Sequence, residues 1–175
     1  MALRILTFLV LTIFSTQVLL QESTKGEFPI GVGDTLVISV YNEADLFVKV
    51  KVDSTGVVKM PLIGEVKVKE KSPSVLEQEI EAALFDGYLT EPDVSVTVAE
   101  FRPFFIKGAV KLPGAYDFRL NLTVNQAIAI GGGLKDRASK SDWYILRGAN
   151  REKISVSKEN QVAPGDIIQI EESIF

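Results

Sequence analysis

Residues 104–134 have the sequence FFIKGAVKLPGAYDFRLNLTVNQAIAIGGGL, which predicts a strand, a tight turn, a second strand and a capped helix. Aromatic and β-branched side chains at 104–106 favour the first strand. Pro113 presets φ for a turn and Gly114 can take a positive φ, which is typical of a type II turn. Residues 116–119 alternate apolar and polar side chains, so they predict a half-buried returning strand.

The helix of this stretch has a start and a stop signal. Thr123 with Gln126 three residues later forms the pattern of a capping box, in which each side chain satisfies a free backbone N–H. Gly131, Gly132 and Gly133 end the helix, since glycine adopts the left-handed conformation that follows a helix C-terminus. The triple glycine lies at the negative end of the helix dipole, so it does not predict a phosphate site.

The composition excludes several classes of function. The 175 residues include no cysteine and no histidine, and the net charge is −4. Disulfides, thiol catalysis, histidine triads and the usual zinc sites are therefore excluded. No basic stripe indicates a nucleic-acid partner. A chain of this length, with 46% hydrophobic residues, can form one domain or two small ones.

The N-terminus predicts export from the cytoplasm. Residues 1–22 carry a positive charge near their start, at Arg4, and continue as an apolar run, which is typical of a signal peptide. We expect cleavage between Ser15 and Ser23. An uncleaved membrane anchor is the alternative, although the run is short for a bilayer span. Residues 23–27 are expected to be a flexible lead-in.

A Gly-Asp turn occurs twice. Gly33-Asp34 precedes the alternating strand pattern of 35–40, and Gly165-Asp166 precedes a similar run near the C-terminus. Gly31 and Gly33 come before a strand, whereas the glycines of a dinucleotide motif follow one, so we interpret them as turn residues. The echo predicts two β-rich modules that begin a strand in the same way.

The first module is expected to contain a hairpin, a strand, a helix and a last strand. The hairpin joins 47–52 to 57–60 across the polar loop 53–56, and 65–69 forms the next strand. Ser72 before Pro73 predicts a helix start, and Gly87 its stop. The helix is expected to bury Leu76, Ile80, Ala83 and Leu84 and to expose Glu77, Gln78 and Glu81. Residues 94–98 then alternate as a strand.

The second module continues through a polar connection, 135–142, into three more strands. These are predicted at 143–146, 153–156 and 166–170.

Four cations form a locally basic group in this acidic chain: Lys111, Arg119, Lys135 and Arg137. Solvated surface charge is one interpretation, and a contact surface for a polysaccharide or another anionic partner is the other. Paired carboxylates could serve a glycosidase. However, nothing in the sequence brings two of Asp34, Glu43, Asp45 and Glu100 together. No catalytic residue, metal site or cofactor is predicted.

The ordered motifs make the chain similar to the bacterial polysaccharide export protein family, the Wza-like exporters. In the first module the resemblance is carried by 30–34, 52–68, the helix 72–84, and 87–88 with 91–96. The second module resembles a single SLBB domain. Its matching motifs are Lys107-Gly108-Ala109-Val110, Pro113-Gly114-Ala115-Tyr116, the helix 122–130, Gly132-Gly133-Leu134 and Pro164-Gly165-Asp166.

The resemblance implies an α+β protein of two small β-rich domains. These are an N-terminal polysaccharide-export domain at 28–100 and a β-grasp-like SLBB domain at 101–175. It also implies a non-enzymatic, homo-oligomeric ring in the periplasm, associated with the outer membrane. The ring would pass capsular polysaccharide or exopolysaccharide in transit and dock onto an inner-membrane polysaccharide co-polymerase.

Two features of longer family members are not found in this sequence, the lipidated cysteine and the C-terminal amphipathic helix. We therefore expect a separate outer-membrane pore protein as a partner. The alternative function is a soluble periplasmic carbohydrate- or small-ligand-binding module that stays monomeric.

Overall fold

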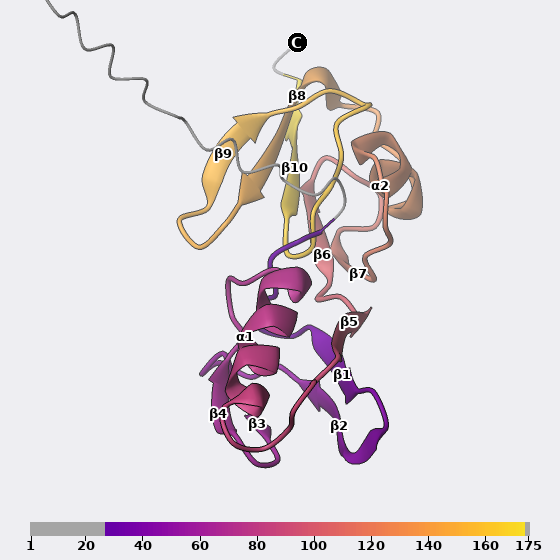
Figure 1. Ribbon diagram of the computed structural model, residues 1–175. Helices are drawn as coiled ribbons and strands as arrows, with labels where there is room; N and C mark the ends of the chain where they lie inside the picture. The colour runs from indigo at the N-terminus through magenta and orange to yellow at the C-terminus, as the bar shows by residue number, and fades with distance from the viewer. Residues whose placement is uncertain (1–26, 174–175) are drawn as a thin grey trace, which may run out of the picture.

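Two β-rich domains follow one another along the chain and stack end to end (Figure 1). The structure is a computed structural model, and it describes residues 27–173. The described residues form mostly β-strands, with two helices. This is the α+β fold of two domains that the sequence predicts. The predicted signal peptide and most of the lead-in lie outside the described residues.

The N-terminal domain combines a three-stranded antiparallel sheet of order β2-β1-β5 with a separate two-stranded sheet and one helix. Its elements are β1 (Thr35–Val40), β2 (Glu43–Lys51), β3 (Val57–Met60), β4 (Gly64–Lys67), α1 (Pro73–Phe85) and β5 (Val94–Glu100). Leu36 and Ile38 of β1 pack in one core with Leu76 and Ile80 of α1. The alternation of β1 and β5 thus buries one face of the sheet against the helix.

The predicted hairpin across residues 53–56 is wrong. β2 pairs with β1, where Val40 lies opposite Glu43, and β3 pairs with β4 instead. The chain reverses between β1 and β2 at Asn42, which has a φ of 60°. Asparagine tolerates this left-handed conformation better than most residues. The loop 53–56 therefore connects two sheets.

Helix α1 begins as predicted. The Ser72 side chain accepts a hydrogen bond from the Val75 N–H, and Pro73 occupies the first helical position. Leu76, Ile80 and Leu84 are buried, whereas Ala83 is exposed, so its assignment to the buried face was wrong.

Two glutamates of α1 do not simply face solvent, as the sequence predicted. Glu77 and Glu81 are half-buried and accept hydrogen bonds from the backbone N–H groups of Val96 and Val94, at 2.8 and 3.1 Å. β5 is an edge strand, so these amides have no neighbouring strand to bind. The helix therefore satisfies the free edge of the sheet.

The C-terminal domain is a five-stranded mixed sheet of order β7-β6-β10-β8-β9 with one helix. Only β10 and β6 pair in parallel. Its elements are β6 (Phe104–Gly108), β7 (Gly114–Tyr116), α2 (Val124–Ile130), β8 (Ala138–Arg147), β9 (Glu152–Ser155) and β10 (Ile167–Glu172). Phe104, Val124, Trp143 and Ile168 belong to its buried core.

The helix signals of residues 104–134 are confirmed, and the turn type is wrong. Both hydrogen bonds of the Thr123–Gln126 capping box form, and the helix ends at Gly131. Gly114 lies within β7, opposite Ile106, and has no positive φ. Gly108 instead has a positive φ, 91°, and a Cβ there would lie 2.0 Å from the Ile170 carbonyl oxygen. The connection predicted at 135–142 is also partly strand, since β8 begins at Ala138.

Three phenylalanines join the two domains. Phe28 precedes β1, Phe101 lies between the two domains, and Phe118 is buried in the second. Their rings pack edge to face, with centroids 5.3 to 6.1 Å apart. Two chain segments therefore reach the junction with partly buried phenylalanines packed against the C-terminal core. Within residues 27–173, neither helix has the length and apolarity needed to cross a membrane.

Candidate functional site

The two Gly-Asp turns have the same backbone and side-chain bonds. The Asp34 carboxylate accepts the N–H of Gly31 at 2.8 Å, and the Asp166 carboxylate accepts the N–H of Ala163 at 2.7 Å. Each aspartate N–H in turn donates to the carbonyl of that same residue, three positions earlier. Both aspartates are 1% exposed. A buried carboxylate needs a charged partner, and in each turn the partner is an arginine.

Arg147 of β8 is the partner of Asp166. Its Nε and Nη2 donate to the two carboxylate oxygens at 2.9 and 2.7 Å, which is a bidentate pair. The hydrogen bond to Asp166 raises the pKa of Arg147 above its ordinary value. Since β8 and β10 are neighbours in one sheet, this pair lies within the C-terminal domain.

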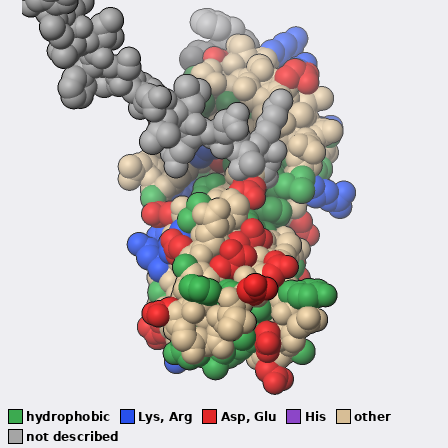
Figure 2. Space-filling model, viewed as in Figure 1, with side chains coloured by type: hydrophobic (Ala, Val, Ile, Leu, Met, Phe, Trp, Pro, Cys, Tyr) green, Lys and Arg blue, Asp and Glu red, His purple; other side chains and the backbone are tan. Residues whose placement is uncertain are grey.

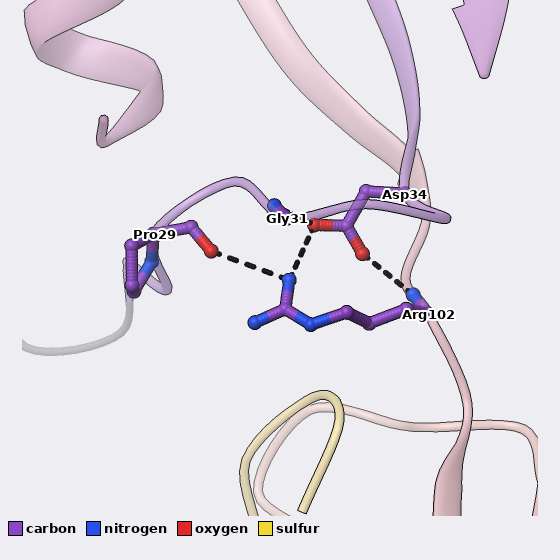
Figure 3. Close-up of polar contacts among 4 residues, drawn as sticks. All are labelled: Pro29, Gly31, Asp34 and Arg102. Carbon is purple, nitrogen blue, oxygen red and sulfur yellow. Dashed lines mark hydrogen bonds and ion pairs between the residues drawn. The ribbon is translucent and has the colours of Figure 1, made fainter. Parts of the chain in front are cut away.

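Arg102, in the linker between the domains, is the partner of Asp34. Its Nη1 donates to Asp34 Oδ2 at 2.6 Å, and its backbone N–H donates to Oδ1, also at 2.6 Å. The same Nη1 donates to the carbonyl of Pro29 at 3.3 Å (Figure 3). Arg102 therefore holds the linker against the first turn of the N-terminal domain.

The Arg102 side chain also packs against the second turn. A Cβ on Gly31 would lie 2.4 Å from Arg102 Nη1, and a Cβ on Gly165 would lie 2.8 Å from Arg102 Nε. Gly165 has in addition a φ of 82°, which favours glycine. The arginine thus lies between the turns of both domains, and glycine at 31 and 165 leaves room for it.

An open cleft of about 570 Å³ surrounds this arginine. It is lined by the first Gly-Asp turn, the linker, the turn between β8 and β9, and the second Gly-Asp turn. We call it the junction cleft. Its charged lining residues are Lys51, Lys69, Glu70, Arg102 and Arg151.

The structure brings together three of the four cations that the sequence singled out. Lys111, Lys135 and Arg137 line a shallow pocket of about 450 Å³ with Asp136 and Glu172. We call it the basic pocket. It forms because the two segments bond to each other, Lys111 N–H to the Gly133 carbonyl and Lys135 N–H to the Ala109 carbonyl. Arg119 is exposed and does not line this pocket.

Two of the carboxylates considered for a glycosidase are separated by a whole strand. Glu43 lies opposite Val40 and Glu100 opposite Thr35, so the two are at opposite ends of β1. Asp34 is bound to Arg102, and Glu100 accepts a hydrogen bond from the Thr35 hydroxyl at 3.2 Å. In the part of the chain that the structure describes, no group of three or more acidic side chains could hold a metal ion.

The sequence predicted both Gly-Asp turns but neither arginine. Arg102 stands in a Phe-Arg-Pro-Phe-Phe run, and a single cation among four apolar residues is a signal that it has a buried partner. Arg147 directly follows the strand predicted at 143–146, and nothing near it in sequence identifies Asp166 as its partner. Such pairs depend on which strands become neighbours in the sheet.

The comparisons with known proteins match both domains in order. Residues 22–99 match the family described as polysaccharide biosynthesis/export protein, and residues 103–158 match the SLBB domain. One curated relative is "Exopolysaccharide production protein ExoF" of Rhizobium meliloti (strain 1021), 32% identical over 113 residues. The alignment covers 63% of this chain and 25% of that relative, so the chain spans about a quarter of its length.

Proposed function

Because this chain belongs to the polysaccharide biosynthesis/export protein family, we propose that it is a non-enzymatic subunit of a polysaccharide export conduit. The conduit carries capsular polysaccharide or exopolysaccharide from the inner-membrane machinery, through the periplasm, towards the outer membrane.

The observation that carries this proposal is the ordered pair of matched domains. The first match ends at residue 99 and the second begins at residue 103. Only the linker that contains Arg102 separates them. Arg102 contacts the Gly-Asp turns of both domains. The relative's printed name concerns exopolysaccharide production.

The partners we propose are further copies of this chain in a ring, an inner-membrane polysaccharide co-polymerase and a separate outer-membrane pore protein. Heterologous, head-to-tail contacts between identical subunits form a closed ring when the rotation from one subunit to the next adds up to one full turn. Large apolar side chains at the surface support such contacts, because association removes them from water. They include Tyr41, Phe47, Phe85 and Tyr88 in the first domain and Leu112, Leu120 and Ile130 in the second.

The surface charge differs between parts of the molecule. Figure 2 shows Asp and Glu side chains gathered over the N-terminal domain on the face that carries α1. The basic pocket is in the C-terminal domain. We propose that Lys111, Lys135 and Arg137 contact an anionic group of the polysaccharide or of a partner protein. Arg119, which lies outside this pocket, was predicted for the same role and remains a separate candidate.

A genetic experiment tests the export function. The gene is deleted in the bacterium that encodes it, and polysaccharide is measured in the medium and in the cells. We expect secretion to be lost and to return when the unaltered gene is supplied on a plasmid. Secretion that continues at its normal level after deletion would contradict the proposal.

The ring is tested separately by light scattering of the purified chain in mild detergent across a concentration series. A discrete high-order oligomer is expected. A monomer at every concentration, both alone and with the co-polymerase added, would instead favour the small-ligand-binding module.

A further inference from the structure

We infer that the junction cleft binds a carboxylated segment of the transported polysaccharide. That the ligand is a saccharide rests on the proposed function. That it is acidic, and where it binds, rests on the charge, surface and rigidity of the cleft itself.

The charge of the cleft is opposite to that of the whole chain. Four cations and one carboxylate line it, although the net charge of the protein is −4. Lys69 Nζ lies 3.7 Å from Glu70 Oε1 in an ion pair, and Arg102 forms an ion pair with Asp34. Lys51 and Arg151 are exposed and have no ion-pair partner among residues 27–173. Two cations thus remain free to bind carboxylates, and charge-assisted bonds of this kind are among the stronger ones.

The uncharged lining suits a sugar ring. Phe105 is 41% exposed and Val32 is 42% exposed, and Pro29, Pro103 and Pro164 line the same cleft. A pyranose ring has C–H faces that pack against aromatic and proline rings, while its hydroxyls remain at the edge in water. A volume of about 570 Å³ also falls within the range of ligand sites.

The cleft is already ordered before a ligand arrives. Arg102 is held by Asp34 through both its side chain and its backbone, and it packs against Gly31 and Gly165. A site that does not need to be ordered on binding loses less affinity to conformational entropy. The two free cations, Lys51 and Arg151, come from different domains and line the cleft together with this fixed arginine.

The test is a calorimetric titration of the full chain in mild detergent with tetragalacturonate, and with maltotetraose as the neutral saccharide of equal length. We expect tetragalacturonate to bind more tightly, and its binding to weaken when NaCl is raised from about 0.05 M to about 0.5 M, because salt screens exposed charges. The double variant Lys51→Gln with Arg151→Gln should bind at least about tenfold more weakly.

The matched control is Lys59→Gln with Lys140→Gln, which also removes two exposed cations, neither of which lines the junction cleft or the basic pocket. This control should bind like the unaltered chain. Absence of tetragalacturonate binding by the unaltered chain, equal affinity for maltotetraose, or unchanged affinity in the cleft variant would each overturn the inference. An equal loss of affinity in the control would overturn it too.

The two proposals fail in different ways. If secretion continues after gene deletion, the export function is wrong whatever the cleft binds. If secretion needs the gene, but the cleft variant binds tetragalacturonate normally, only the inference about the cleft is wrong.

Discussion

The two Gly-Asp turns differ in where their arginines come from. Asp166 binds Arg147 of the neighbouring strand, inside one sheet, through two parallel hydrogen bonds. Asp34 binds Arg102 of the linker, through one side-chain bond and one backbone bond. The same turn therefore stabilises a domain in one place and a junction between domains in the other. A repeated motif predicts a local conformation, whereas its role depends on what lies beside it.

The largest expected effect comes from removing either aspartate. Asp166→Ala removes the acceptor of three hydrogen bonds, two from Arg147 and one from the Ala163 N–H, and should cost about 3 kcal/mol of unfolding free energy. Asp34→Ala should cost a similar amount, but in the other domain. Trp143, the single tryptophan, lies in the C-terminal domain and reports its unfolding by fluorescence. In urea titrations, only Asp166→Ala should strongly lower the urea concentration at the midpoint of the Trp143 fluorescence transition. Equal shifts of this midpoint in both variants would contradict the comparison.

The arginines should separate stability from domain arrangement. Arg147→Ala leaves Asp166 only the Ala163 N–H and should cost about 2 kcal/mol, less than a fully buried pair because Arg147 is partly exposed. Arg102→Ala keeps the hydrogen bonds that the backbone N–H groups of residues 31 and 102 donate to Asp34, so it should cost about 1 kcal/mol of unfolding free energy. Small-angle scattering should nevertheless show a wider spread of shapes for Arg102→Ala alone. An unchanged scattering profile would count against a junction role for Arg102.

The glycines that contact Arg102 should rank by their backbone conformation. Gly165→Ala combines a positive φ with a close approach to Arg102, and we expect a loss of about 1 to 2 kcal/mol. Gly31 has no positive φ, so in Gly31→Ala the end of the flexible arginine side chain can move aside. The loss should be smaller there. Thermal unfolding of both variants measures the order, and the reverse order would show that crowding outweighs backbone strain.

An exposed aspartate turn should show the smallest effect. Asp53 has no arginine partner in the described chain, and its pKa is lowered chiefly by the hydrogen bond from the Thr55 hydroxyl. A lowered folded-state pKa stabilises the protein above the unfolded-state pKa, and this contribution is lost as pH falls through the folded value. Asp53→Asn should therefore be slightly destabilised at neutral pH and indistinguishable at low pH in urea titrations. A large effect at neutral pH would contradict the comparison.

Local patterns predicted the helices of this protein well. The Ser72–Pro73 start and the Thr123–Gln126 capping box are confirmed, because each involves residues three or fewer positions apart. The hairpin across 53–56 was wrong because Gly56 gives a stronger turn signal than Asn42, where the chain in fact reverses. Local turn signals do not identify which strands pair.

Long-range contacts explain the other differences. Gly108, not Gly114, has the left-handed conformation, and the Ile170 carbonyl of β10 leaves no room for a Cβ there. Arg102 reaches an aspartate 68 positions away. Of the basic residues, Lys111, Lys135 and Arg137 meet because a bridge joins Val110 to Leu134, and Arg119 has no such constraint. The sequence showed the charges, and the topology decided which of them meet.

The glutamates of α1 that bind β5 also limit how copies of this chain can aggregate. Val94 and Val96 already donate their outward N–H groups to Glu81 and Glu77, so a foreign strand would have to displace two side chains to pair there. The opposite edge strand, β2, ends in Lys49 and Lys51, and charged lysines discourage strand addition. The three-stranded sheet is thus protected against edge-to-edge fibre growth, and any ordered assembly through it is left to its side-chain surfaces.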